Sequence, residues 1–89
     1  MKGVITVIGK DRTGIIAEIS GLLYSEEVNI GSINQAIMDD LFTMVMIVDL
    51  KEMINGFDIL QHRLNEVAHQ LKVDIRIQKE EIFNRMHML

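Results

Sequence analysis

Residues 9–14, with the sequence GKDRTG, place chargeable side chains between two apolar runs. The run before them, residues 4–8, is rich in β-branched residues and predicts a strand, whereas the run after them has helical spacing. A loop at this junction would face the free N–H groups of the first helical turn, which favour a carboxylate or a phosphate. Asp11 could receive an ammonium group, so the two features together would suit an α-amino acid.

The same loop also admits a purely structural interpretation. Asp11 or Thr13 could cap the helix with a side-chain oxygen while Arg12 stays in solvent. Gly14 would relieve crowding, or would let a ligand approach the backbone closely. The loop has fewer glycines than a phosphate-binding loop, so these residues alone leave both a turn and a ligand site open.

Asn29 and Asn34 are polar residues within residues 28–38, a stretch that otherwise predicts a strand. A buried amide needs hydrogen-bond partners, so each asparagine would need such partners if its side chain were buried. Asn29 could cap the turn that follows Glu27, or it could contact a ligand held by the loop of a neighbouring subunit. The sequence leaves both roles open.

His62, Glu66 and His69 are spaced at i, i+4 and i+7 in a predicted helix, and such a set can bind a metal ion. They lie opposite the apolar stripe of that helix, so the pattern predicts a solvated face and no metal site. Nucleophilic catalysis has little to use, because cysteine is absent and no serine lies in a nucleophile motif. We therefore expect no catalytic residue, no metal and no cofactor.

Seven elements are needed to position these residues. The apolar spacing predicts strands at residues 2–8, 28–38, 41–50 and 73–77, and helices at residues 14–26, 55–71 and 80–89. The first six elements have the order βαββαβ, followed by a short tail helix. Right-handed crossovers then place both main helices on one face of a four-stranded antiparallel sheet, which is a ferredoxin-like α+β sandwich.

Several details of these elements are also predicted. In residues 28–38, strict alternation places Ile30 on one face and Ile33 and Ile37 on the other. Asn55 and Asp58 resemble a capping box before the second helix. The strand at residues 73–77 alternates cleanly, so one of its faces should be wet.

The second face of the sheet needs a cover, because residues 4–8 and 41–50 are apolar on both sides. The tail helix, another subunit, or both could supply it. Methionines gather in the hairpin and the tail, where they suit a core or a subunit interface.

Composition narrows the class of protein. Eighty-nine residues predict one domain, and 48% hydrophobic residues are many for so small a chain. The net charge of −4 argues against a nucleic-acid partner, and Phe42 is the sole aromatic residue in the central strands, too few for an RNA-binding sheet. No apolar run approaches the roughly 20 residues of a membrane span. We expect a cytoplasmic protein without a nucleic-acid or membrane partner.

The order of motifs resembles an ACT domain. A strand is followed by GKDRTGIIAEISGLLYSEEVNIGSI, a hairpin, a helix and a strand, with D-R-x-G at the first junction and VNI opening the second strand. The resemblance covers residues 2–79, and it is greatest to single-ACT bacterial proteins and to the ACT part of the glycine-cleavage-system repressor. It implies one ACT-like domain over residues 1–89, with a core at 2–79 and a tail at 80–89.

The resemblance also implies a function. ACT domains are regulatory, associate edge to edge through the second strand or face to face, and commonly bind small ligands such as amino acids at the interface. The implied ligand contacts are Asp11 and the backbone of Arg12, Thr13, Gly14 and Ile15 in one chain, with Asn29 from another. The implied partners are a second copy of this chain, an amino-acid-like ligand and a regulated protein. Gly9 departs from the serine-binding members, which have a histidine there, and Thr13 stands where many members have proline.

Two other functions remain as alternatives. Gly9 favours a ligand-blind module that serves only oligomerisation or protein interaction. An acylphosphatase-like enzyme shares the architecture and would use Arg12 with Asn29 or Asn34, although a shared fold is weak evidence for chemistry.

Overall fold

The structure, a computed structural model, describes residues 1–86. Within them the chain forms the predicted order of elements: β1 (Lys2–Lys10), α1 (Ile15–Ser25), β2 (Asn29–Met38), β3 (Leu41–Asp49), α2 (Phe57–Leu71), β4 (Val73–Lys79) and α3 (Glu80–Met86). The order agrees with the prediction, and β1 and β4 each run two residues further than expected. The last part of the predicted tail helix, residues 87–89, lies outside the described residues.

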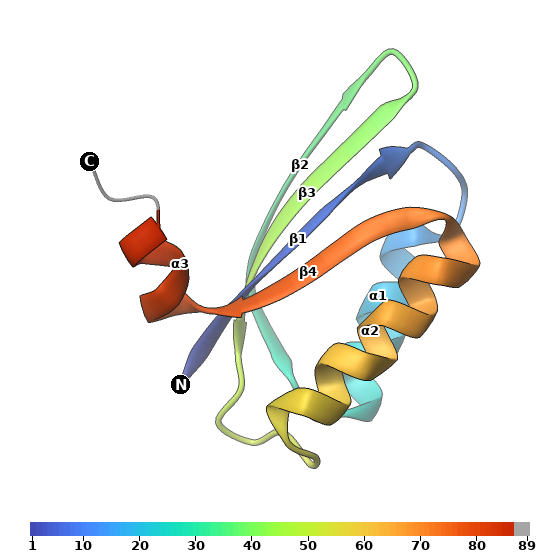
Figure 1. The fold of residues 1–89 in the computed structure, drawn as a ribbon. Coiled ribbons are helices and arrows are strands. Elements are labelled where there is room, and N and C mark those ends of the chain that lie inside the picture. The colour runs from blue at the N-terminus through green and yellow to red at the C-terminus, as the bar shows by residue number, and fades with distance from the viewer. Residues whose placement is uncertain (87–89) are drawn as a thin grey trace.

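The four strands form one antiparallel sheet in the order β2-β3-β1-β4. Both α1 and α2 cover the same face of this sheet, as Figure 1 shows. The architecture is therefore the predicted ferredoxin-like sandwich. Lys2 lies opposite Asp49 and Lys10 lies opposite Leu41, so the beginning of β1 and its end mark the two ends of the sheet.

The core lies between the helices and the sheet. Alternate residues of the central strands face the helices, and the paired residues Ile5–Met46 and Val7–Met44 are almost completely buried. The helices contribute the apolar stripes that their spacing predicted, including the buried residues Ile19, Leu23, Leu60 and Leu64. In β4, Ile75 and Ile77 are buried while Asp74 and Arg76 are exposed, which confirms the predicted wet face.

The edge strand β2 contains a β-bulge that the sequence analysis missed. Ile30 pairs with Val48 and Ser32 pairs with Ile47, so Gly31 is an additional residue without its own partner. The bulge reverses the alternation, and Ile30 therefore lies on the same, helix-facing side as Ile33. The prediction that these two residues lie on opposite faces is wrong, because it assumed an unbroken period of two.

The second helix also begins differently from the prediction. Gly56 occupies the N-cap position of α2 and provides no side-chain cap, so the capping box of Asn55 and Asp58 is not formed. The amide of Asn55 instead donates to the carboxylate of Glu26 at the end of α1. The side chain of Asn55 therefore bonds to a residue distant in sequence and not to the first turn of α2, as the motif suggested.

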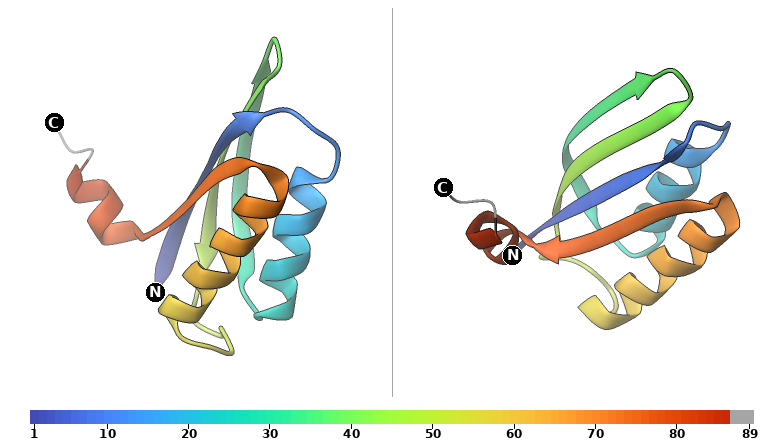
Figure 2. Two further views of the ribbon diagram at one scale, coloured as in Figure 1. Left: turned by 45° about the vertical axis from the view of Figure 1, so that its right-hand side comes forward. Right: turned by 45° about the horizontal axis from the view of Figure 1, so that its top comes forward.

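The tail helix α3 covers part of the second face. It packs against β1 and β4, where Val4 points away from the main helices and is only 2% exposed. The amide of Gln78 approaches the Met86 sulfur at 3.3 Å. Both views in Figure 2 show α3 at one end of the sheet. Further along this face Ile8, Leu41 and Val45 remain exposed, so α3 alone does not cover it.

Candidate ligand site at the β1–α1 loop

The loop that carries Asp11, Arg12 and Thr13 connects the end of β1 to α1. The backbone N–H of Asp11 donates to the carbonyl of Asp40 at 2.6 Å, which ties the loop to the turn between β2 and β3. All three side chains are exposed. The loop therefore has a fixed backbone and side chains that are accessible to a ligand.

The first turn of α1 is open to solvent. Gly14 is the N-cap residue, with φ 96° and no side-chain cap, so the prediction that Asp11 or Thr13 caps this helix is wrong. Among residues 1–86, and apart from Gly14 and its two chain neighbours, no atom lies within 4 Å of the position that a Cβ on Gly14 would occupy. Since the positive φ favours glycine and the space beside it is empty, an anionic group could approach the N–H groups of Ile15 and its neighbours.

Gly9 faces Val73, and this contact explains why Gly9 has no side chain. A Cβ at Gly9 would lie 2.7 Å from Cγ1 of Val73 and 3.0 Å from its Cα. The volume that a side chain at position 9 would need is therefore already filled by the start of β4. A histidine, which the serine-binding members have at this strand end, could not be accommodated here without a backbone shift.

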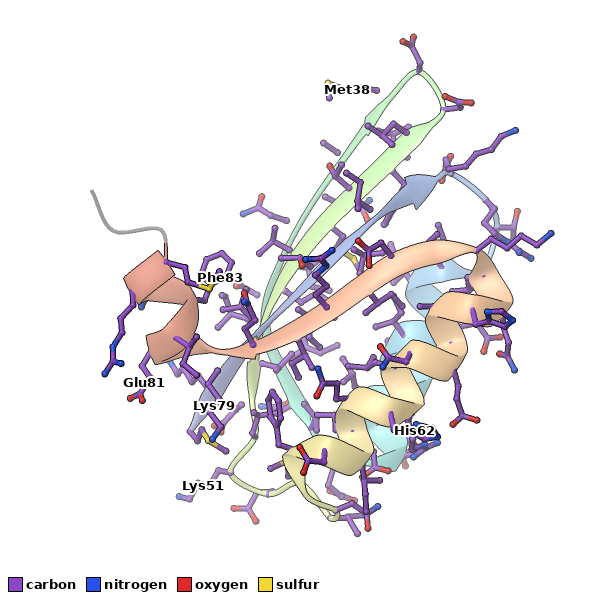
Figure 3. All side chains as sticks on the ribbon, in the orientation of Figure 1. Met38, Lys51, His62, Lys79, Glu81 and Phe83 are labelled. Atoms are coloured by element: carbon purple, nitrogen blue, oxygen red, sulfur yellow. The ribbon has the colours of Figure 1, made fainter. Side chains whose placement is uncertain are left out.

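Asn29 lies far from the loop within one chain. It pairs with Asp49 at the end of the sheet where β1 begins, whereas Asp11 follows the other end of β1. The eight steps from Lys2 to Lys10 correspond to about 26 Å at about 3.3 Å per residue. Met38 and Lys51, labelled in Figure 3, show these two opposite ends of the hairpin. Arg12 and Asn29 consequently do not form a catalytic pair within one chain.

The surroundings of Asn29 form a surface cavity of about 500 Å³. Its lining residues are Tyr24, Glu27, Val28, Asn29, Asp49, Lys51 and Glu52. Glu27, in the turn before β2, has φ 58°, the left-handed conformation that reverses the chain after α1. Asn29 is exposed, so its amide is accessible at this end of the sheet.

A buried charge that was not predicted from the sequence lies beside this turn. Glu26 is only 2% exposed, and its carboxylate accepts hydrogen bonds from Arg63 and from Asn55, the latter at 3.0 and 3.1 Å. The Arg63 guanidinium is the main reason that the pKa of Glu26 lies below its ordinary value, since burial acts in the opposite direction. The carbonyl of Glu26 also accepts the N–H of Ile54 at 3.0 Å. The clue in the sequence was that Glu26 falls on the apolar stripe of its helix.

The histidine-containing face of α2 is solvated, as predicted. His62 Nε2 lies 3.9 Å from Glu66 Oε1, and the two side chains are 75% and 64% exposed. His69 is exposed too. His62 projects from α2 away from the sheet in Figure 3. Among residues 1–86, no three histidine or acidic side chains gather in a geometry that could hold a metal ion.

The sequence and the fold together identify the family. The sequence profile described as the ACT domain matches residues 3–78, nearly the whole span of the sheet and its helices. The chain belongs to the ACT domain family. ACT domains are regulatory, ligand-binding modules, and this membership is consistent with a regulatory role.

Relatives and solved structures agree with this membership. This ACT domain is 45% identical over 89 residues to a UPF0237 protein of Listeria innocua, covering 100% of both chains. It is similar to an ACT domain protein from Streptococcus pneumoniae, with a TM-score of 0.81 and 38% identity over 93% of each chain. A putative glycine cleavage system transcriptional repressor shares the fold, with a TM-score of 0.75 and 24% identity over 88% of this chain and 44% of that one.

One further finding concerns the helices of this ACT domain. Along residues 1–86, none of them is both long enough and apolar enough to cross a membrane.

Proposed function

We propose that this chain is a non-enzymatic regulatory domain that homo-oligomerises and binds a small amino-acid-like ligand at the subunit interface. The observation that carries the proposal is the separation of its polar elements. The Asp11 loop and Asn29 lie at opposite ends of one sheet, about 26 Å apart by the strand rise. A site that uses both must therefore take the loop from one copy and Asn29 from another.

The loop has groups suited to both ends of an α-amino acid. The ligand carboxylate would accept hydrogen bonds from the first N–H groups of α1, where Gly14 leaves open space and no side chain caps the helix. The ligand ammonium would pair with the Asp11 carboxylate, which is exposed. Arg12 and Thr13 would complete the contacts from the same loop. Ile15, whose side chain is buried, would take part through its backbone N–H, and the amide of Asn29 would contact the ligand from the second copy.

A regulated protein would receive the signal. An interface that includes the ligand is more stable when the ligand is bound, because binding to the assembled state shifts the assembly equilibrium. A protein partner that binds the exposed surface of the chain would recognise such a change of assembly.

Calorimetric titration of the full chain with each standard amino acid tests the ligand part. We expect heat and a thermal shift from at least one of them, and neither signal from any amino acid would contradict it. The amino acid that binds then serves as the probe for two variants, Asp11→Ala and Asn29→Ala, each of which should lose binding.

Mixing these two variants tests the composite site. In a mixed dimer one site carries both changes and the other carries neither, so statistical exchange should restore about a quarter of the original sites. Recovery in the mixture shows that the two residues act across subunits. If the mixture still fails to bind the amino acid although each variant remains dimeric, Asp11 and Asn29 do not contribute to one site from two subunits.

The ligand-blind module remains as the second candidate, and Gly9 favours it. Gly9, near the end of β1, is packed against Val73 and has no side chain that could hold a ligand. A stable dimer without heat from any amino acid would support this alternative.

A further inference from the structure

Asn55 and Gly56 form the one Asn-Gly pair of the sequence. The other four asparagines, at positions 29, 34, 65 and 84, precede isoleucine, glutamine, glutamate and arginine. Asparagine is most prone to spontaneous deamidation when glycine follows it, because the backbone nitrogen of a residue without a Cβ can approach the side-chain Cγ closely. The sequence therefore singles out Asn55 among the asparagines.

The structure leaves the reacting atoms of this pair accessible. Both residues are exposed. Within residues 1–86, and apart from Gly56 and its two chain neighbours, no atom lies within 4 Å of the position of a Cβ on Gly56. The Gly56 carbonyl accepts the N–H of Leu60 at 3.1 Å, whereas its own N–H donates no hydrogen bond in the described part of the chain. Gly56 is thus fixed on its carbonyl side as the N-cap of α2, and its nitrogen remains available for a reaction.

The amide that deamidation would remove has a structural role. Asn55 Nδ2 donates to both carboxylate oxygens of Glu26, at 3.0 and 3.1 Å. Glu26 is 2% exposed, and Arg63 of α2 also donates to its carboxylate. The carbonyl of Glu26 accepts the N–H of Ile54 at 3.0 Å, so the end of α1 is joined to the loop before α2 (Figure 2, left). A chemical change at Asn55 would therefore act directly on a buried carboxylate.

We propose that Asn55 deamidates spontaneously and that its conversion opens the contact between the end of α1 and the start of α2. This inference goes beyond the proposed function and does not depend on it. The Gly56 nitrogen loses its proton and bonds to Cγ of Asn55, while the bond from Cγ to Nδ2 breaks and Nδ2 leaves as ammonia. The product of this step is a cyclic imide.

Water then opens the imide at either of its carbonyl carbons. Attack at Cγ breaks the new bond to the Gly56 nitrogen and gives aspartate. Attack at the main-chain carbonyl carbon breaks the original peptide bond and gives isoaspartate, in which the chain continues through Cγ. The whole reaction consumes water and releases ammonia, and solvent supplies the water because Asn55 is exposed.

Both products disrupt the contact with Glu26. An ionised carboxylate only accepts hydrogen bonds, so aspartate would set a second negative charge where a donor now lies 3.0 and 3.1 Å from the Glu26 oxygens. Isoaspartate carries the same charge and also adds a carbon to the main chain directly before the N-cap residue of α2. Arg63 would then be the single cation beside two carboxylates.

Incubation of the folded chain at pH 7, followed by peptide mapping with mass spectrometry, tests the reaction. We expect aspartate and isoaspartate to accumulate at position 55 and not at the other asparagines. Gly56→Ala is the control, because its φ of −75° suits any residue and a Cβ has space there, so the fold should persist while the conversion falls below detection.

A peptide of residues 52–59 gives the reference rate, since Glu26 does not restrain its asparagine. The folded chain should convert more slowly than this peptide, but measurably. No conversion at position 55 once the peptide has reacted completely, or earlier conversion at another asparagine, would overturn the proposal.

Asn55→Asp reproduces one product and tests its effect on the fold. Its Tm should fall by at least about 4 °C, because hydrogen bonds to a charged group are lost and a like charge takes their place. Asn65→Asp, which is exposed in α2, adds the same charge and should leave the Tm nearly unchanged. Equal Tm values for the two variants would contradict the proposed opening.

Combining Asn55→Asp with Glu26→Gln tests whether the loss passes through this contact. The combination exchanges donor and acceptor, so that an amide at position 26 can donate to a carboxylate at position 55. We expect the two Tm losses to be less than additive, which is the sign of a direct interaction. Fully additive losses would assign the effect of Asn55→Asp to a different contact and would overturn the proposal.

Discussion

The N–H of Asp11 donates to the carbonyl of Asp40 at 2.6 Å and thereby joins the β1–α1 loop to the tip of the β2–β3 hairpin. The bond uses only backbone atoms, so the side chain of Asp11 is not needed to hold the loop. The loop and the edge strand therefore form one connected surface, in which the carboxylate of Asp11 remains available to a ligand.

Asp11→Asn separates binding from folding. We expect the affinity for the amino acid found by calorimetry to fall by about tenfold or more, because a charge-assisted hydrogen bond to the ligand is lost. The free energy of unfolding should change by less than about 0.5 kcal/mol, since the backbone bond to Asp40 remains. Asp58→Asn, in the first turn of α2, is the matched control and should bind normally. Equal affinity in the two variants would remove Asp11 from the site.

Glu26→Gln tests the buried charge at the end of α1. Because the pKa of Glu26 is lowered in the folded chain, its contribution is present above the ordinary value of 4.5 and is lost as the pH falls through the lower native value. We expect the variant to be less stable than the parent by about 1–2 kcal/mol at pH 7, and the difference to shrink in acid. Urea unfolding from pH 7 to pH 3 measures this. Glu66→Gln, which is exposed, should show no such convergence.

Two glycine-to-alanine changes should alter the stability of the chain in opposite directions. Gly9→Ala places a Cβ 2.7 Å from Val73 and should destabilise the chain by about 1–3 kcal/mol. A Cβ at Gly21 would have no close neighbour from outside its own stretch of α1 among residues 1–86, so Gly21→Ala should stabilise the chain by about 0.5–1 kcal/mol. Thermal unfolding of the two variants measures both effects. A neutral Gly9→Ala would mean that β1 and β4 can separate at this point without cost.

Removal of residues 80–89 should leave the dimer intact. The polar elements of the proposed ligand site lie in the β1–α1 loop and at the start of β2, whereas α3 packs against β1 and β4. The truncated chain should nevertheless unfold at a lower temperature, because the packing of α3 against β1 and β4 is lost. Sedimentation and thermal unfolding measure the two outcomes separately. A monomeric truncated chain that is still folded would assign the interface to the tail instead.

The order of elements could be predicted because it depends on local periodicity. The stripe of α2 and the alternation of Ile75 and Ile77 both indicate which side is buried, and short connections then restrict the topology. The error in β2 arose because Gly31 is compatible with either a regular strand or a bulge. Only its pairing with β3 distinguishes the two.

The candidate site was less predictable, because its geometry depends on contacts between distant residues. The sequence suggested Asp11 and Thr13 as caps, yet the helix begins at a glycine in the left-handed conformation. The partners of Glu26 lie 29 and 37 positions away, at Asn55 and Arg63, and no local motif reveals them. The separation of Asp11 from Asn29 likewise follows from the direction of the strands and not from either residue's neighbours.

The bulge at Gly31 divides β2 into two segments that differ in how they contact the core. Ile30, before the bulge, packs against the core, whereas the residues after the bulge are exposed. A change in the outer segment need not disturb the anchor of Asn29. The exposed outer part of the edge could thus change in sequence between related proteins while the end of the strand that carries Asn29 stays unaltered.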